Sequence, residues 1–140
     1  MSRIFWDTNL FIYLFEGFGP LSKQVASLRS RMIARNDQLL TSTMTLGEIL
    51  VKPSAVGDTK TAASYHKLIT TTALVVPFEK KAALAYARIR ADRSVHPPDA
   101  IQLACAASEG VDLFITNDAR LHAKQISGIQ FIVPLDRAPI

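Results

Sequence analysis

The stretch Arg3-Ile4-Phe5-Trp6-Asp7 lies near the N-terminus and decides the expected fold. Its first four residues are mainly apolar and have the length of a short buried β-strand. Asp7 follows this strand directly. Because open α/β sheets bind their ligands beyond the carboxyl ends of the strands, we expect Asp7 to stand at an edge where a site forms.

Four more runs of strand length follow, each rich in β-branched or other apolar residues. They are Gln38 to Ser42, Leu74 to Pro77, Asp112 to Thr116 and Ile129 to Val133. Helical patterns cover Leu21 to Arg35, Thr45 to Val51, Lys60 to Thr70, Glu79 to Arg93 and Pro98 to Glu109, with shorter ones beginning near Leu10 and Asp118. This alternation predicts an α/β fold with a mainly parallel sheet.

The composition is that of one globular domain spanning residues 1–140. Of these residues 49% are hydrophobic and 20% charged, and no linker or repeat divides the chain. The apolar run Leu10 to Phe15 is too short to cross a bilayer, so we expect no membrane segment and no export. Cys105 is the only cysteine and fits a core residue in a reducing cytoplasm.

The chain carries a formal net charge of +4 at neutral pH. A positive balance attracts polyanions such as nucleic acids, but an ordinary basic surface explains it equally well.

Four acidic residues form the candidate site: Asp7, Glu48, Asp99 and Asp118. Each follows a predicted strand closely, except Asp99, which stands in the first turn of the helix announced by two prolines. Glu48 lies in an apolar segment that we expect to be largely buried, and buried carboxylates are rare unless paired or bound to metal. Several carboxylates without cysteine or a nearby histidine suit Mg²⁺ or Mn²⁺ rather than zinc.

Each acid also has a purely structural explanation. Asp7, Asp99 and Asp118 could cap helices or hold turns, and Glu48 could pair with Lys52 one helical turn later. Only their convergence at one edge would separate a site from four independent structural roles.

The motifs together resemble the PIN-domain ribonucleases, and in size and layout the VapC-type toxins of bacterial toxin-antitoxin pairs. Nearly the whole chain takes part in the resemblance. Asp7-Thr8-Asn9 resembles the family's opening acid motif, and Thr41 to Leu50 (TSTMTLGEIL) the segment with the second acid. Pro98 to Ala104 (PDAIQLA) is similar to the third-acid helix, and Thr116-Asn117-Asp118 to the closing element.

The resemblance implies a three-layer α/β/α fold and cleavage of RNA phosphodiester bonds with Mg²⁺ or Mn²⁺. It also implies a homodimer and a cognate antitoxin that blocks the site. Metal binding is carried over to Asp7, Glu48, Asp99 and Asp118. Thr116 would orient a ligand, carboxylate or water, and Asn9 would assist by hydrogen bonding.

The charged helix and loop before Asp99 offer a candidate RNA surface. Phosphates beside the cut could lie on Arg90, Arg93 and His96, although a charged helix face is more often simply solvated. The aromatic segment from Phe11 to Phe18 is expected to be mostly core, with any exposed part available to an antitoxin segment.

Three rival functions stay open. A phosphatase similar to the haloacid dehalogenases would use Asp7 as nucleophile but needs a second aspartate where Asn9 stands. The other two are a non-catalytic RNA-binding module of the same fold and a nuclease that cuts DNA.

Overall fold

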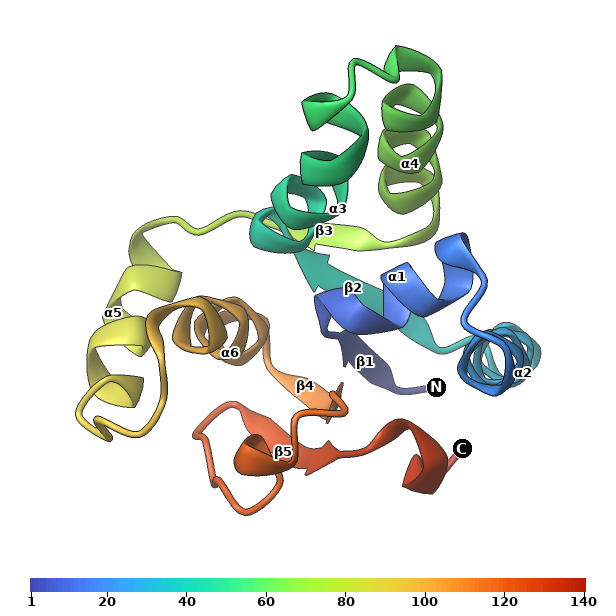
Figure 1. Cartoon of the computed structure of the whole chain (residues 1–140). Helices are drawn as coiled ribbons and strands as arrows, with labels where there is room; N and C mark the ends of the chain where they lie inside the picture. The colour runs from blue at the N-terminus through green and yellow to red at the C-terminus, as the bar shows by residue number, and fades with distance from the viewer.

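The computed structural model describes residues 1–140 (Figure 1). The strands are β1 (Arg3–Trp6), β2 (Gln38–Ser42), β3 (Leu74–Val76), β4 (Val111–Ile115) and β5 (Ile129–Val133). The α-helices are α1 (Thr8–Glu16), α2 (Pro20–Arg35), α3 (Thr43–Ala55), α4 (Thr59–Thr72), α5 (Lys80–Ile89) and α6 (Pro97–Glu109). Two 3₁₀ turns follow, η1 (Ala119–Leu121) and η2 (Leu135–Arg137).

All five strands are parallel and lie in the order β3-β2-β1-β4-β5. β1 is therefore the central strand, with β2 on one side and β4 on the other. In the register, Trp6 lies opposite Ile115, so the residues that follow β1 and β4 meet at one edge. The predicted α/β fold with a parallel sheet is confirmed.

Each face of the sheet carries its own apolar core, which makes three layers (Figure 1). Phe5 and Phe114 stack at 5.0 Å between ring centroids and pack with α5 and α6. On the other face, Ile4 and Trp6 pack with α1 and α2. The alternation of side chains along β1 sends successive residues to opposite layers, because neighbouring strand residues point to opposite faces.

The pair α3 and α4 extends past the β3 edge of the sheet, as Figure 1 shows. The aromatic segment after β1 is mostly core, as expected: Phe11 is buried and Phe15 stacks on Tyr65 of α4 at 5.0 Å, whereas Phe18 is 48% exposed. No helix of the chain has both the length and the apolar character needed to cross a membrane.

Several predicted boundaries differ from the structure. The helix predicted from Glu79 to Arg93 ends at Ile89, because Asp92 accepts hydrogen bonds from the backbone and hydroxyl of Ser94 and closes a turn there. Arg90 and Arg93 thus lie beyond the helix. The helix predicted to begin at Thr45 begins two residues earlier, since the Ser42 hydroxyl caps it by accepting from the Thr45 amide.

Candidate active site

The four predicted acids line one pocket at the carboxyl edge of the sheet. This cavity of about 280 Å³ lies between the starts of α1 and α6, the side of α3 and the turn after β4. Its lining residues are Asp7, Thr8, Asn9, Ile12, Glu48, Pro98, Asp99, Gln102 and Asp118. The expected convergence at this edge is therefore present, and Asn9 belongs to the same pocket.

Asp7 is the most firmly held of the acids. Its Oδ1 atom accepts from the Thr8 amide at 2.8 Å and from Gln102 Nε2 at 3.3 Å, and its Oδ2 atom accepts from the Thr116 hydroxyl at 2.7 Å. Burial nevertheless raises the pKa of the Asp7 carboxyl, and the charge of Asp118 adds to that rise. Asp7 caps α1 as well, so its structural explanation and its place in the site hold together.

Asp118 is held by its own turn. Its amide donates to the Thr116 hydroxyl at 3.1 Å, so Thr116 links the first and last acids. Arg120 grips the Asp118 carboxylate with Nε at 3.0 Å and Nη2 at 2.6 Å. These hydrogen bonds lower the pKa of Asp118. Asp118 also caps η1 by accepting from the Arg120 amide.

Asp99 faces the pocket from the first turn of α6. Its pKa is raised, first by burial and then by the negative charges of Asp118 and Asp7. Arg120 Nη2 lies 3.7 Å from its Oδ2 atom, and the charges of Arg120 and His96 partly offset the rise. The carboxylates thus lie close enough to disfavour one another's ionisation.

Glu48 departs from the prediction. The expectation that its segment is largely buried is wrong, because only one face of α3 meets the core: Ile49 is buried, whereas Val51 is 64% exposed and Glu48 is exposed at the pocket. The alternative of a bridge to Lys52 is not formed either, since Lys52 pairs with Glu16 at 3.0 Å. Glu48 instead accepts a 2.7 Å hydrogen bond from the Thr8 hydroxyl.

Gln102 is one of two residues of the site that the sequence analysis did not single out, and Arg120 is the other. Gln102 is only 3% exposed, and its Nε2 lies 2.7 Å from Thr45 Oγ1 and 3.0 Å from Thr8 Oγ1, while its Oε1 accepts from the Ser42 hydroxyl. Thr8 in turn donates to Glu48, so this buried network joins α1, α3 and α6 behind the acids. A polar amide inside an otherwise apolar helix segment was the available signal.

The three residues of the predicted RNA surface do not lie on one helix face, because all of them follow the end of α5. Arg90 donates to the Val95 carbonyl at 2.8 Å and so supports the loop that leads into α6. Arg93 and His96 are exposed, and only His96 lies near enough to affect Asp99. Contact with RNA therefore stays a prediction for these three residues.

The donor set suits a hard divalent cation, since carboxylate oxygens are the ligands that Mg²⁺ and Mn²⁺ prefer. Burial and neighbouring negative charge raise the pKa values of Asp7 and Asp99, so a bound cation would favour the ionised form of both carboxyls. As the side chains lie, no three acidic, histidine or cysteine residues are gathered tightly enough to enclose a metal ion. Metal binding fits the chemistry of the pocket and requires its side chains to move.

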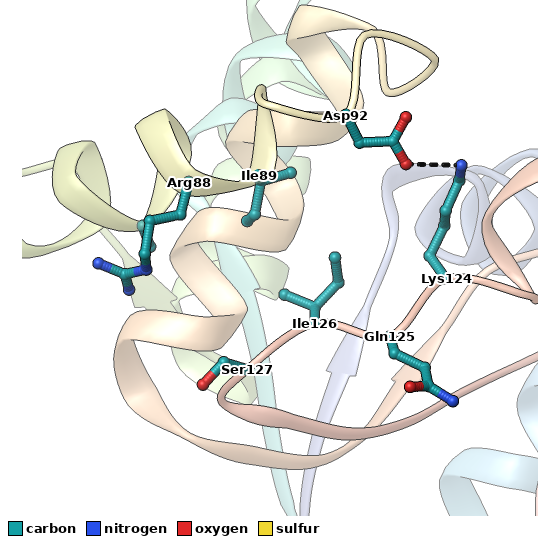
Figure 2. Close-up of a pocket in the computed structure, with 8 residues that line it drawn as sticks. Arg88, Ile89, Asp92, Lys124, Gln125, Ile126 and Ser127 are labelled. Atoms are coloured by element: carbon teal, nitrogen blue, oxygen red, sulfur yellow. Dashed lines mark hydrogen bonds and ion pairs between the residues drawn. The ribbon is translucent and has the colours of Figure 1, made fainter.

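A second cavity, of about 230 Å³, lies between the end of α5 and the loop before β5 (Figure 2). Figure 2 shows Asp92 and Lys124 joined across its side by an ion pair of 2.8 Å, and the Lys124 ammonium helps to lower the pKa of Asp92 to about 2. None of the predicted site residues lines this cavity. The acid pocket is therefore the candidate active site.

The fold and the pocket define a three-layer α/β protein with an acidic site at the carboxyl edge of a parallel sheet. The chain belongs to the PIN domain family, whose model matches residues 4–126. This confirms the family resemblance seen in the sequence motifs, and with it a protein of the nuclease kind. No curated protein matches the chain.

Solved structures share the fold. One is a chain of VapBC2 from Rickettsia felis bound to a promoter DNA fragment, with 15% identity, a TM-score of 0.75 and coverage of 94% of this chain and 98% of that one. The DNA-bound VapBC of Salmonella typhimurium gives 22% identity, a TM-score of 0.71 and coverage of 96% and 99%. VapBC-5 of Mycobacterium tuberculosis gives 23% identity, a TM-score of 0.62 and coverage of 96% of this chain and 99% of that one.

Proposed function

We propose that this protein is a Mg²⁺- or Mn²⁺-dependent endoribonuclease and the toxin of a toxin-antitoxin pair. The observation that carries the proposal is the convergence of four carboxyls in one pocket, where burial and, after it, the repulsion between neighbouring carboxylates raise the pKa of Asp7 and Asp99. A divalent cation would relieve that repulsion, and a pocket that needs a cation and opens at a sheet edge suits phosphodiester chemistry.

Asp7, Glu48, Asp99 and Asp118 would hold the cation, which supplies Lewis acidity and lowers the pKa of a bound water. Thr116 and Gln102 keep the Asp7 carboxylate in one orientation, because they donate to its two different oxygens. Thr8 donates to Glu48 and thereby directs that flexible side chain into the pocket. Exposed Asn9 contributes an amide at the entrance for a hydrogen bond to substrate.

The toxin role rests on the family and on two solved structures that share the fold: one is described as a toxin-antitoxin complex from Klebsiella pneumoniae, and VapBC-5 is described as a member of a family of toxin-antitoxin systems. We propose an antitoxin as partner, a homodimer as the assembly and the cytoplasm as the location. The antitoxin would cover the acid pocket and exclude RNA from it.

Cleavage assays with purified protein test the proposal. Wild type should cut single-stranded RNA with Mg²⁺ or Mn²⁺, lose this activity in EDTA and regain it when the metal is restored. Asp7→Asn should not cut, whereas Asp136→Asn should match wild type, because Asp136 is exposed and lies outside the pocket. Cleavage of RNA that persists in excess EDTA would overturn the metal-dependent mechanism.

The same preparation separates the rivals. Cutting of a matched single-stranded DNA but not of RNA would make the protein a DNA nuclease. Release of phosphate from a phosphomonoester would favour a phosphatase, and RNA binding without cleavage would favour a non-catalytic module.

Induced expression in bacteria, followed by mapping of RNA ends, should give growth arrest and discrete cuts for wild type and neither for Asp7→Asn.

A further inference from the structure

One basic side chain lies directly against the acids of the pocket. Arg120 contacts Asp118 through two nitrogens and approaches Asp99 at 3.7 Å, yet its side chain is 65% exposed. The two carboxylates are less exposed, at 21% and 23%. The guanidinium therefore lies beside the pocket, on the solvent side of two of its acids.

The contact leaves much of the guanidinium unused. Nε and Nη2 donate to Asp118 and Nη2 also approaches Asp99, while Nη1 makes no hydrogen bond within the protein. A guanidinium has five N–H donors in a planar fork that matches a carboxylate or a phosphate. Arg120 can therefore donate to a phosphate oxygen by a turn of its side chain alone, while the backbone of η1 stays where it is.

The negative charge of the pocket means that a polyanionic substrate needs a positive side chain such as Arg120 nearby. Asp7, Glu48, Asp99 and Asp118 bring four carboxyls to the lining, and a phosphodiester must approach them. Among the basic side chains only Arg120 is in ion-pair contact with these acids, and the imidazole of His96 and that of His122 are the other groups that affect them.

We propose that Arg120 is a catalytic residue that binds the phosphate next to the cut, and that the metal-free acids hold it in waiting. The inference rests on the proposed function and deepens it. Asp118 and Asp99 would offer a divalent cation the same oxygens that they now offer the guanidinium, so metal binding would weaken their hold on Arg120. The released guanidinium then turns to the phosphate. Because the ion pair is exposed, the exchange needs little energy.

Metal binding without RNA tests the first half. Mn²⁺ is titrated into wild type, Arg120→Gln and Arg137→Gln, with free Mn²⁺ followed by its spin-resonance signal. The control, Arg137, is also exposed and pairs only with Asp136, at 4.0 Å. Arg120→Gln should bind Mn²⁺ about three- to tenfold more tightly than wild type, and Arg137→Gln should equal wild type. Equal affinity in all three proteins would overturn the competition.

Cleavage kinetics test the second half. Despite its tighter metal binding, Arg120→Gln should show a higher KM for RNA, and the salt dependence of KM should become shallower by about one phosphate contact. Arg120→Lys should restore the salt dependence because it keeps the charge, but not the full rate because it lacks the fork. A KM and salt slope equal to those of Arg137→Gln would overturn the inference.

Wild type separates the two levels of failure. If wild type cleaves RNA with metal and Arg120→Gln is indistinguishable from it, only the role of Arg120 is wrong. If wild type neither binds Mn²⁺ nor cleaves RNA, the proposed function fails and the inference with it. Circular dichroism of each variant checks that the exposed substitutions leave the fold intact.

Discussion

The two walls of the acid pocket are built differently. The inner wall, formed by Asp7, Thr8 and Gln102, is tied to the core by hydrogen bonds among these residues and by one from the buried Thr116 behind them. The outer wall, formed by Asp99 and Asp118, depends on ion pairs with the exposed Arg120 beside it. The same residue type thus has a raised pKa at Asp7 and a lowered one at Asp118.

The difference separates orientation from adjustment. Asp7 cannot turn without breaking hydrogen bonds to both oxygens, so it fixes where a ligand would lie. Asp118 can exchange its guanidinium partner for another cation at little cost, because its partner is exposed to water. In such a pocket the rigid wall fixes where a ligand binds, and the adjustable wall can exchange its ion-pair partner to admit that ligand.

The largest expected effect comes from removing the charge of each wall in turn. Asp7→Asn should lower kcat for RNA cleavage by more than about 100-fold, because no neighbouring group can take the place of a buried, fixed carboxylate. Asp118→Asn should lower kcat by about tenfold, since Asp118 is half-buried and its present partner, Arg120, is exposed, so that water can take over part of its role. Single-turnover cleavage at saturating Mg²⁺ measures both, and equal losses would remove the distinction between the walls.

Gln102→Leu should break the inner wall without touching its charges. The change leaves hydroxyls of Thr8 and Thr45 short of a partner in the core, so it should cost about 1–3 kcal/mol of unfolding free energy. It should also lower kcat by about 10- to 100-fold, as loss of a group that orients a ligand does. Urea unfolding and cleavage rates report the two effects, and Gln125→Leu on the exposed loop before β5 is the control.

The metal-free protein should show opposite pH responses for the two walls. The raised pKa of Asp7 means that its ionisation destabilises the fold as pH rises from 3.8 through the folded value. The lowered pKa of Asp118 means that its charge stabilises the fold above 3.8, and that this gain is lost as pH falls through the folded value.

In EDTA near neutral pH, Asp7→Asn should therefore be relieved of a destabilising charge, and Asp118→Asn should be less stable than wild type. The difference for Asp7→Asn should vanish below about pH 3.8, whereas that for Asp118→Asn should vanish only below the lowered folded pKa of Asp118, where wild type is protonated too. Asp99→Asn should follow Asp7→Asn, because the pKa of Asp99 is also raised. Unfolding curves between about pH 3 and pH 7 measure these differences, and slopes of the same sign for all three variants would contradict the comparison.

The smallest expected effect lies beside the pocket. Lys52→Ala removes an exposed ion pair with Glu16 and should cost about 0–1 kcal/mol while leaving cleavage unchanged. A marked loss of activity would mean that Lys52 acts on Glu48 after all. Thermal unfolding and cleavage rates with Glu16→Gln as a companion variant decide between the two readings.

Much of this architecture could be predicted because it depends on the order of residues within short segments of the chain. Apolar runs such as Arg3 to Trp6 marked the strands, and the position of Asp7 and Asp118 after strands marked the shared edge. The prediction for Glu48 failed because apolar neighbours indicate only that one face of the helix is buried. They do not say whether the Glu48 carboxyl lies on that face or on the exposed one.

The two residues that were missed owe their surroundings to distant parts of the chain. Gln102 meets Ser42 across 60 positions of sequence, and nothing near either residue indicates the other. Arg120 follows Asp118 by two residues and resembles an ordinary turn residue until α6 brings Asp99 beside it.

The central position of β1 has a consequence for synthesis on the ribosome. β1 is made first, but its partner β4 begins only at Val111, and the bond from Thr116 to Asp7 spans 109 positions. Until β4 has left the exit tunnel, one edge of β1 has no neighbour and the Asp7 carboxylate lacks its main donor. Translation at about 5–20 residues per second therefore sets a delay of several seconds before any chain can assemble the pocket. A chain that is released before β4 carries an open strand edge, which invites aggregation, and no assembled acid pocket.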